Sequence, residues 1–287
     1  MNAMPSLAEL RRDQYEYNGR LYPYINDFAR NPYTFIKARF YMEASAILVF
    51  FLLKTKIKPN AVTLLYAFCG LLGGILLSIP TNITILLALF IFFSKGIFDW
   101  SDGHFARITK QTSLTGYVLD PYGAMINAIG FWVGLSFYLA HASKMAVFYY
   151  LAPLYSILLA ANPLVFGNDL LVRTILDQGW SKLNVPVIKQ DISNKSSSVG
   201  QQNKGRLFGL INDYYLKGFP DDRARTIDLV CLLIIFELLT GIFVTWTIYV
   251  LFLFKSLLLF IYAFYKLYIK NSIVNTAIDL KEVTING

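Results

Sequence analysis

Three aspartates stand at spacings that could bring their carboxylates together around a metal ion. Asp99 and Asp102 are three residues apart, so on a helix they lie on one face. Asp120 follows a connection short enough to make its helix an antiparallel neighbour of theirs. Carboxylates packed together repel one another, and a hard divalent cation that prefers oxygen ligands relieves that repulsion. No cluster of His or Cys accompanies them in the sequence, so a softer metal is not indicated.

Small residues and one arginine surround these acids. Gly103, Ala106 and Gly116 leave the helix surface bare, which makes room for a bulky ligand against the backbone. Arg107 adds a planar cation suited to phosphate. Together these features indicate a pyrophosphate site, in which metal ions neutralise the leaving phosphate. The structural alternative is that the aspartates only form ion pairs at a helix end, with Lys95, Arg107 or Lys110.

This segment resembles the signature of the CDP-alcohol phosphotransferases (class I CDP-alcohol phosphatidyltransferases), Asp-x2-Asp-Gly-x2-Ala-Arg-x8-Gly-x3-Asp-x3-Asp. Every position but the last matches with its spacing intact, at Asp99, Asp102, Gly103, Ala106, Arg107, Gly116 and Asp120. The Pro59-Asn60-x-x-Thr63 segment is also similar to that family. The resemblance covers roughly residues 40–165 well and the remainder only in layout.

The resemblance implies a six-helix membrane bundle with a cytoplasm-facing cavity, two Mg²⁺ or Mn²⁺ ions and a CDP-linked donor. An alcohol acceptor attacks the β-phosphate of the donor and CMP leaves. Phospholipid biosynthesis is the commonest use of this pattern. By position, the expected metal ligands are Asp99, Asp102 and Asp120. The expected nucleotide and phosphate contacts are Gly103, Ala106, Arg107, Gly116 and Thr63.

Ala124 occupies the position of the last signature aspartate, which in the family is the proposed general base and a ligand of the second metal ion. An alanine can neither take a proton nor bind a metal, so weakened binding of the second ion and impaired activity are expected. Three explanations stay open: a deliberate change, a natural member that takes its base from elsewhere, and a member that binds without turnover. Under the second explanation Asn127 is a neutral metal ligand, and the substitute base is His104 or one of Asp191, Asp213, Asp221 and Asp222.

The composition of the chain and its long apolar stretches predict an all-α integral membrane protein. Of the 287 residues, 56% are hydrophobic and only 15% are charged, which does not describe a soluble surface. A helical span needs about 20 mostly apolar residues. Six spans are predicted: about Ala61–Ile79, Ile83–Phe98, Tyr117–Ala140, Met145–Val165, and two within Ile227–Tyr268 that separate near Thr240–Trp246.

The basic residues predict the orientation of these spans. Lys and Arg concentrate in the N-terminal arm, the second-to-third connection, the fourth-to-fifth connection and the C-terminal tail, which places these segments, both termini and the active site in the cytoplasm. The short apolar stretch Ala44–Leu53 predicts an amphipathic helix lying in the membrane interface. The predicted organisation is an arm over 1–58, a membrane domain over 59–270 that includes the 168–225 connection, and a tail over 271–287.

The net charge of +8 does not indicate nucleic acid, because the basic residues lie between apolar spans, where an anionic membrane surface explains them. Two small-residue motifs, Gly70-x3-Gly74 and Gly130-x3-Gly134, predict close packing inside the bundle, with homodimer contact as the alternative. Glu237 and Lys255 read as a structural pair or as snorkelling side chains.

Two other classes of membrane protein compete with the phosphotransferase. An intramembrane prenyltransferase also uses acidic helix motifs with Mg²⁺, but the spacing of Gly103, Ala106, Arg107 and Gly116 disfavours it. A transporter would more usually show inverted repeats and broken helices.

Overall fold

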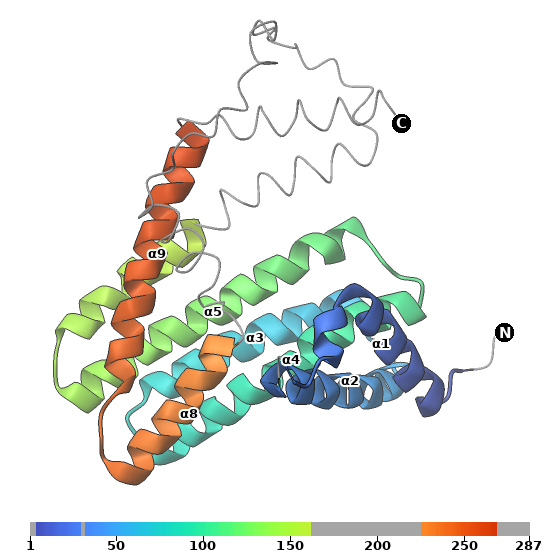
Figure 1. Cartoon of the computed structure of the whole chain (residues 1–287), viewed down its shortest axis with the longest axis horizontal. Coiled ribbons are helices and arrows are strands. Elements are labelled where there is room, and N and C mark those ends of the chain that lie inside the picture. The colour runs from blue at the N-terminus through green and yellow to red at the C-terminus, as the bar shows by residue number, and fades with distance from the viewer. Residues whose placement is uncertain (1–3, 30–31, 162–224, 269–287) are drawn as a thin grey trace, which may run out of the picture. The chain divides into compact units, whose positions relative to one another are not determined.

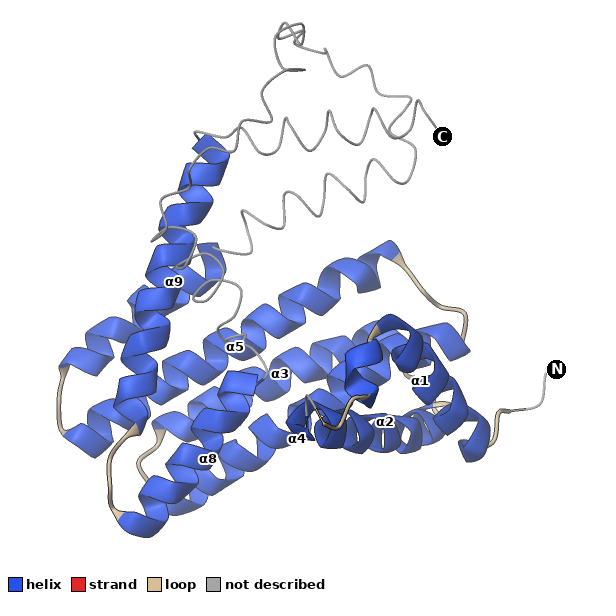
Figure 2. Cartoon of the chain, in the orientation of Figure 1, coloured by secondary structure: helices blue, strands red, loops and turns tan. Residues whose placement is uncertain are grey.

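The computed structural model describes residues 4–29, 32–161 and 225–268, and within these ranges the chain is helical with no strand (Figures 1 and 2). The contacts group the chain into two units. One unit contains residues 1–156 and 222–246 and holds every candidate site residue that the structure describes. The other contains residues 157–221 and 247–287. All of the 168–225 connection except Arg225, and the whole of the 271–287 tail, fall outside the described residues, so their predicted roles remain predictions.

The N-terminal arm folds into two α-helices and a short 3₁₀ turn. Helix α1 spans Leu7–Leu21, η1 spans Pro23–Asn26 and α2 spans Pro32–Leu52. The predicted ten-residue helix was therefore wrong in extent, because α2 has 21 residues and begins twelve positions earlier. Helix α1 was not predicted at all. The location of these helices at a membrane interface stays a prediction.

Helix α1 begins with a reciprocal cap. The Ser6 hydroxyl accepts from the backbone N–H of Glu9, and the Glu9 carboxylate accepts from the backbone N–H and the hydroxyl of Ser6. This arrangement satisfies N–H groups that a helix start leaves unpaired. The hydrogen bonds to Ser6 also hold the pKa of the exposed Glu9 carboxyl below its ordinary value.

Three long helices form the centre of the first unit: α3 over Pro59–Ser78, α4 over Asn82–Ile108 and α5 over Leu114–Ser143. Pro59 opens α3, a position where its missing N–H costs nothing. Thr81 caps α4 and Ser113 caps α5 through their hydroxyls. The second span runs ten residues beyond its predicted end, so the whole Asp99–Arg107 segment is helical.

Glycines bring α3 and α5 into backbone contact. A Cβ on Gly70 would collide with the backbone of Asn127, and one on Gly74 would collide with the carbonyl of Gly130. Gly134 in turn faces Gly74, where an added Cβ would lie 2.5 Å from the carbonyl oxygen. The prediction that both Gly-x3-Gly motifs pack within one bundle is confirmed. These glycines form contacts between two helices of the same chain, and the homodimer stays a prediction.

Helix α3 lies between α4 and α5 and packs extensively against both. The expectation that α4 and α5 would be direct neighbours is therefore corrected: they scarcely touch along their lengths. Phe92 of α4 crosses over Gly73 of α3 and meets Phe131 of α5 edge to face, with ring centroids 4.9 Å apart. Because Gly73 has no side chain, the ring of Phe92 has room to reach Phe131, and the two outer helices contact each other across α3.

The remaining described helices are α8 over Arg225–Thr240, α9 over Thr245–Tyr268 and an apolar helix over Val147–Ala161. The break between the last two predicted spans is confirmed at Gly241, whose φ of +73° favours glycine. Glu237 accepts from the Tyr138 hydroxyl at 2.8 Å and from the Val244 N–H at 2.7 Å. Glu237 thus has a structural role at the end of α8, and its predicted pairing with Lys255 stays a prediction.

Four described helices are long and apolar enough to cross a membrane: Pro59–Ser78, Asn82–Ile108, Val118–Ser143 and Thr245–Tyr262. Their number and apolar character support an integral membrane protein. The helices over Val147–Ala161 and Arg225–Thr240 are shorter than such a span, since they have 10–17 described residues. The predicted total of six spans therefore stays a prediction.

Candidate active site

Two of the predicted metal ligands lie together on one side of α4. Asp99 is half-buried and Asp102 is buried, one turn apart. The hydroxyl of Thr63 on α3 donates to Oδ2 of Asp102 at 2.6 Å, and the N–H of Gly103 donates to Oδ1 at 2.6 Å. Both carboxylate oxygens of Asp102 therefore have a donor, and the orientation of this side chain is fixed.

Asp120 approaches from α5. Its negative charge acts on both Asp99 and Asp102, and the charge of Asp102 also acts on Asp99. The positive charges of Lys95 and Lys37 oppose this repulsion at Asp99. The charges of the three predicted carboxylates thus act on one another, and their convergence on a metal ion stays a prediction.

Helix geometry places Ala124 beside Asp120. At about 100° per residue, positions 124 and 131 lie within about 40° of Asp120 around α5. Phe131 on this edge reaches Phe92 of α4. Ala124, half-buried, consequently occupies the edge of α5 that is turned toward α4. This is where a last signature aspartate would join the other three.

Asn127 lies within about 20° of Asp120 around α5 but two turns further along the helix, where it is fully buried against α3. Its Nδ2 donates to the carbonyl of Tyr66 at 3.2 Å, and its Oδ1 has no hydrogen-bond partner in the chain. The structure therefore packs Asn127 against backbone at Gly70, where it meets none of the three aspartates in any recorded contact.

The small residues keep backbone accessible near the acids. Gly103 sits under the side chain of Arg107, whose Nη1 would lie 3.4 Å from a Cβ at that position. Gly116 faces the start of α3, where a Cβ would lie 3.0 Å from Oδ1 of Asn60. Ala106 is half-buried on α4. These positions fit the predicted nucleotide shelf in size, and their role stays a prediction.

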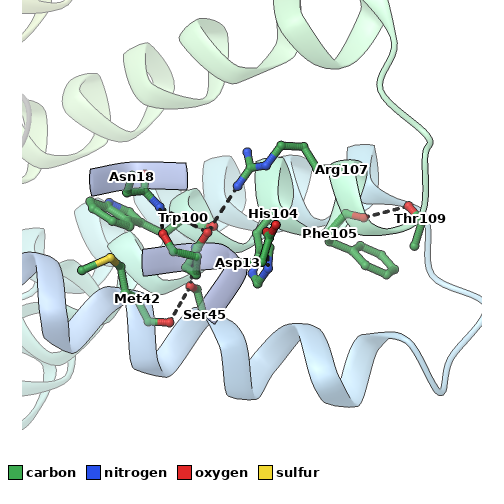
Figure 3. Close-up of polar contacts among 10 residues, drawn as sticks. Asp13, Asn18, Met42, Ser45, Trp100, His104, Phe105, Arg107 and Thr109 are labelled. Carbon is green, nitrogen blue, oxygen red and sulfur yellow. Dashed lines mark hydrogen bonds and ion pairs between the residues drawn. The ribbon is translucent and has the colours of Figure 1, made fainter. Parts of the chain in front are cut away.

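Arg107 reaches from α4 to α1 (Figure 3). Its Nη2 donates to Oε1 of Gln14 at 3.2 Å, and its Cζ lies 3.6 Å from the ring centroid of Tyr17. Sequence reasoning missed both partners, because α1 is polar and was read as part of an irregular arm. The Ser6-x-x-Glu9 capping pattern was the signal that could have revealed this helix.

His104 lies on the opposite side of α4 from Asp102. Residues two apart on a helix point about 160° away from each other. The buried ring of His104 has Nε2 3.3 Å from Oδ2 of Asp13 on α1, as Figure 3 shows. The structure does not bring this candidate base together with the aspartates. The other candidates, Asp191, Asp213, Asp221 and Asp222, lie outside the described residues.

The donor set was compared with what a divalent cation requires. Three carboxylates from two helices supply the oxygen ligands that Mg²⁺ and Mn²⁺ prefer, and their mutual repulsion favours a bound cation. Their chemistry therefore fits such an ion. Within the described residues, however, no group of three His, Cys, Asp or Glu side chains is arranged as a formed metal site. The metal ions are accordingly part of the proposal below.

The comparisons with known proteins bear on this segment. Residues 56–178 match the family described as CDP-alcohol phosphatidyltransferase, and this range contains Thr63 and every signature position from Asp99 to Ala124. No curated protein and no solved structure matches the chain. The resemblance inferred from the signature is confirmed by this match, which makes residues 56–178 similar to the CDP-alcohol phosphatidyltransferase family.

Proposed function

We propose that this membrane protein transfers a substituted phosphate group from a CDP-linked donor to an alcohol acceptor and releases CMP, in a reaction that depends on Mg²⁺ or Mn²⁺. The family similarity supports an enzyme of this kind. The observation that carries the proposal is the family match over residues 56–178, which contains the signature acids Asp99, Asp102 and Asp120, whose charges act on one another. Such a cluster of carboxylates in a membrane helix bundle is costly unless it is used.

Each residue has a role in the proposed reaction. Asp99, Asp102 and Asp120 would hold divalent ions, and Thr63 orients Asp102 through its 2.6 Å hydrogen bond. Ions bound there would neutralise charge on the pyrophosphate of the donor. Arg107 lies about 80° from Asp99 and about 140° from Asp102 around α4, and its long side chain would bring a positive charge to the same phosphates. The bare backbone near Gly103, Ala106 and Gly116 leaves room for the cytidine.

The acceptor hydroxyl must lose its proton when it attacks the β-phosphate. Ala124 occupies the position from which a carboxylate would take that proton, and it also lacks a ligand for a second ion. We assign no base role to His104, whose ring lies on the far side of α4 beside Asp13. Slow turnover is therefore expected, since a positioned general base contributes about 10²–10⁴-fold to a rate.

Ala124 also favours a second candidate function, binding of metal and nucleotide without turnover. The two functions share the acidic cluster and differ in whether CMP is released. The same protein with Ala124→Asp separates them, because a restored carboxylate can raise turnover only in an enzyme whose remaining machinery is intact.

The decisive experiment is a panel assay on purified protein in detergent or vesicles, with several CDP-alcohols, lipid and polar alcohol acceptors, and Mg²⁺, Mn²⁺ or chelator. CMP is the readout. Divalent-dependent CMP release that Asp102→Asn abolishes is the expected result. Absence of CMP release from both the Ala124 protein and its Ala124→Asp variant contradicts the transferase. A prenyl diphosphate included as a separate arm tests the prenyltransferase alternative, which predicts thermal protection by that ligand.

The wider setting belongs to the same proposal. We place the reaction in phospholipid or related membrane-lipid biosynthesis, with the active site and both termini in the cytoplasm, in an arrangement of six spans. Charged reagents that label single introduced cysteines from one side of sealed vesicles test this orientation. Labelling near residue 80 and near residue 110 should occur from opposite sides of the membrane.

A further inference from the structure

We infer that α1 is a positioning element of the phosphate site: Gln14 and Tyr17 hold the guanidinium of Arg107 in place without neutralising it, so that the charge remains available to the pyrophosphate of the donor. The inference rests on the proposed function and deepens it. Its basis is a buried polar network in which the amino-terminal helix, outside the 56–178 segment matched by the family, contacts a residue inside that segment.

The orientation of the Gln14 amide is determined by its surroundings. Gln14 is buried, and its Nε2 donates to Oγ of Ser45 at 2.7 Å and to the carbonyl of Trp100 at 3.1 Å. Ser45 uses its own hydrogen in a bond to the carbonyl of Met42, so it must accept from Gln14. With both amide hydrogens engaged, Oε1 is left to accept.

Two donors converge on that oxygen. Nδ2 of Asn18 lies 3.2 Å from Oε1 of Gln14, and Nη2 of Arg107 lies 3.2 Å from the same atom (Figure 3). Asn18 is itself held by a 2.8 Å hydrogen bond to the Gln14 carbonyl. Helices α1, α2 and α4 thus together fix one acceptor at one end of the guanidinium, which a flexible surface amide would not do.

Tyr17 fixes the plane of the guanidinium from its face. The 3.6 Å distance from Cζ of Arg107 to the ring centroid is a close cation–π contact. Neither the ring nor the Gln14 amide carries a formal negative charge. Among the described residues no carboxylate forms an ion pair with Arg107, and its buried Nε has no hydrogen-bond partner in the chain.

A buried N–H without a partner calls for a ligand or water to satisfy it. A phosphate oxygen suits a guanidinium that has an unused donor and on which the carboxylates of Asp13 and Asp102 act only from beyond ion-pair distance. Arg107 also folds back over Gly103, one turn toward the amino-terminal end of α4, and the charge of Asp102 acts on it. The positioning by α1 and the phosphate role of Arg107 are therefore consistent.

A purely structural role for α1 makes a different prediction. Helix α1 is also attached by contacts that do not involve Arg107, including the 2.7 Å ion pair between Arg11 and Glu43 and the buried side chain of Leu10. If α1 served only to cover α2 and α4, weakening these contacts and weakening the Gln14 contact would have similar effects. If it positions Arg107, only the Gln14 and Tyr17 changes affect phosphate binding.

The test measures equilibrium binding of CDP and of cytidine, with Mn²⁺ present, to the full-length protein, six single variants and one double variant. Gln14→Glu places a carboxylate against Arg107, and Gln14→Met removes the acceptor at similar length. Tyr17→Leu removes the ring, Tyr17→Phe retains it, and Arg11→Ala is the matched control on the same helix. Arg107→Gln supplies the background for a double-mutant cycle.

We expect Gln14→Glu, Gln14→Met and Tyr17→Leu each to weaken CDP binding by about tenfold while cytidine binding is unchanged. Tyr17→Phe and Arg11→Ala should bind CDP like the unmodified protein. In the Arg107→Gln background, Gln14→Met should cause no further loss, because its effect passes through the arginine. Thermal unfolding of each variant identifies those that fail to fold.

Three results overturn the inference. CDP affinity that is unchanged in Gln14→Glu, or that falls equally in Arg11→Ala, shows that α1 does not position the guanidinium. An equal loss from Gln14→Met with and without Arg107 has the same meaning. If the unmodified protein binds no CDP, the nucleotide part of the proposed function fails and the inference fails with it, whereas normal binding in all variants overturns the inference alone.

Discussion

The hydroxyl of Thr63 on α3 donates a 2.6 Å hydrogen bond to Oδ2 of Asp102 on α4. The methyl group of the same Thr63 side chain lies near Gly123 of α5. One small residue on the middle helix therefore contacts both helices that carry the acids. This relationship explains how α4 and α5 can share a site although α3 separates them along most of their lengths.

Thr63→Val should weaken divalent-metal affinity by about 10–100-fold, because loss of a partner that orients a metal ligand typically has that effect. Thr63→Ser, which keeps the hydroxyl, is the matched control and should bind Mn²⁺ almost normally. Mn²⁺ titration followed by electron paramagnetic resonance gives both affinities. Equal affinities in the valine and serine variants would remove Thr63 from the proposed site.

Asp102→Asn should abolish divalent-dependent CMP release, with a loss of at least about 10²–10³-fold in kcat. The amide keeps the shape of the side chain but cannot neutralise a cation. Glu43→Gln changes an acid outside the signature and is the control, which should release CMP like the unmodified protein. Asp102→Asn with unchanged activity is the outcome that this proposal does not survive.

Ala124→Asp should raise CMP release by about 10²–10⁴-fold, because it supplies a carboxylate on the α4-facing edge of α5. Ala124→Asn has nearly the same size but no basic group, so it should leave turnover close to that of the unmodified protein. Initial rates of CMP release with saturating donor and Mn²⁺ compare the two variants with the unmodified protein. A similar gain in the asparagine variant would mean that side-chain volume, and not the base, limits the reaction.

Gly74→Ala should destabilise the protein by about 1–3 kcal/mol, because the added Cβ meets the carbonyl of Gly130 and the backbone cannot yield cheaply. Leu71→Ala, on an exposed part of the same helix, is the control and should change stability much less. Reversible unfolding in mixed micelles gives both values. A tolerated Gly74→Ala would indicate that α3 and α5 are not in backbone contact.

Asp228→Asn should cost roughly 3 kcal/mol or more, because Asp228 is buried on α8 and accepts hydrogen bonds from Tyr33 and Lys37 of α2. The substitution leaves the Lys37 ammonium without its anionic partner. Glu43→Gln breaks the exposed pair with Arg11 and should cost about 1 kcal/mol or less. Lys37→Met combined with Asp228→Asn should recover part of the loss. Equal costs at Asp228 and Glu43 would contradict the burial argument.

The central helices and the acids that they carry could be predicted from the sequence, because the apolar stretches and the signature residues indicate the same elements. The apolar stretches after Pro59, Thr81 and Ser113 predicted the three central helices, and the signature placed the acids on two of them. The glycine motifs predicted close packing, since only backbone contact explains glycine at that spacing in a membrane helix. The family match then confirmed the reading of the signature.

Elements that bury polar side chains were not predictable in the same way. Helix α1 is polar overall and buries Gln14 and Asn18 as well as Leu10, so it does not stand out as an apolar stretch. The position of α3 between α4 and α5 depends on which faces pair in three dimensions, and a short connection between consecutive helices does not decide that. The direction of His104 toward α1 could not be predicted either, because α1 itself was not predicted.

The backbone contact between α3 and α5 has a consequence for how sequences with this arrangement can vary. Side chains that face lipid can be exchanged freely, but the glycine-lined seam does not permit an insertion or deletion of a single residue. One added residue between Gly123 and Gly130 would rotate Asp120 by about 100° away from its partners, and the seam could not absorb the slip. Drift in length should therefore be confined to the loops and the termini.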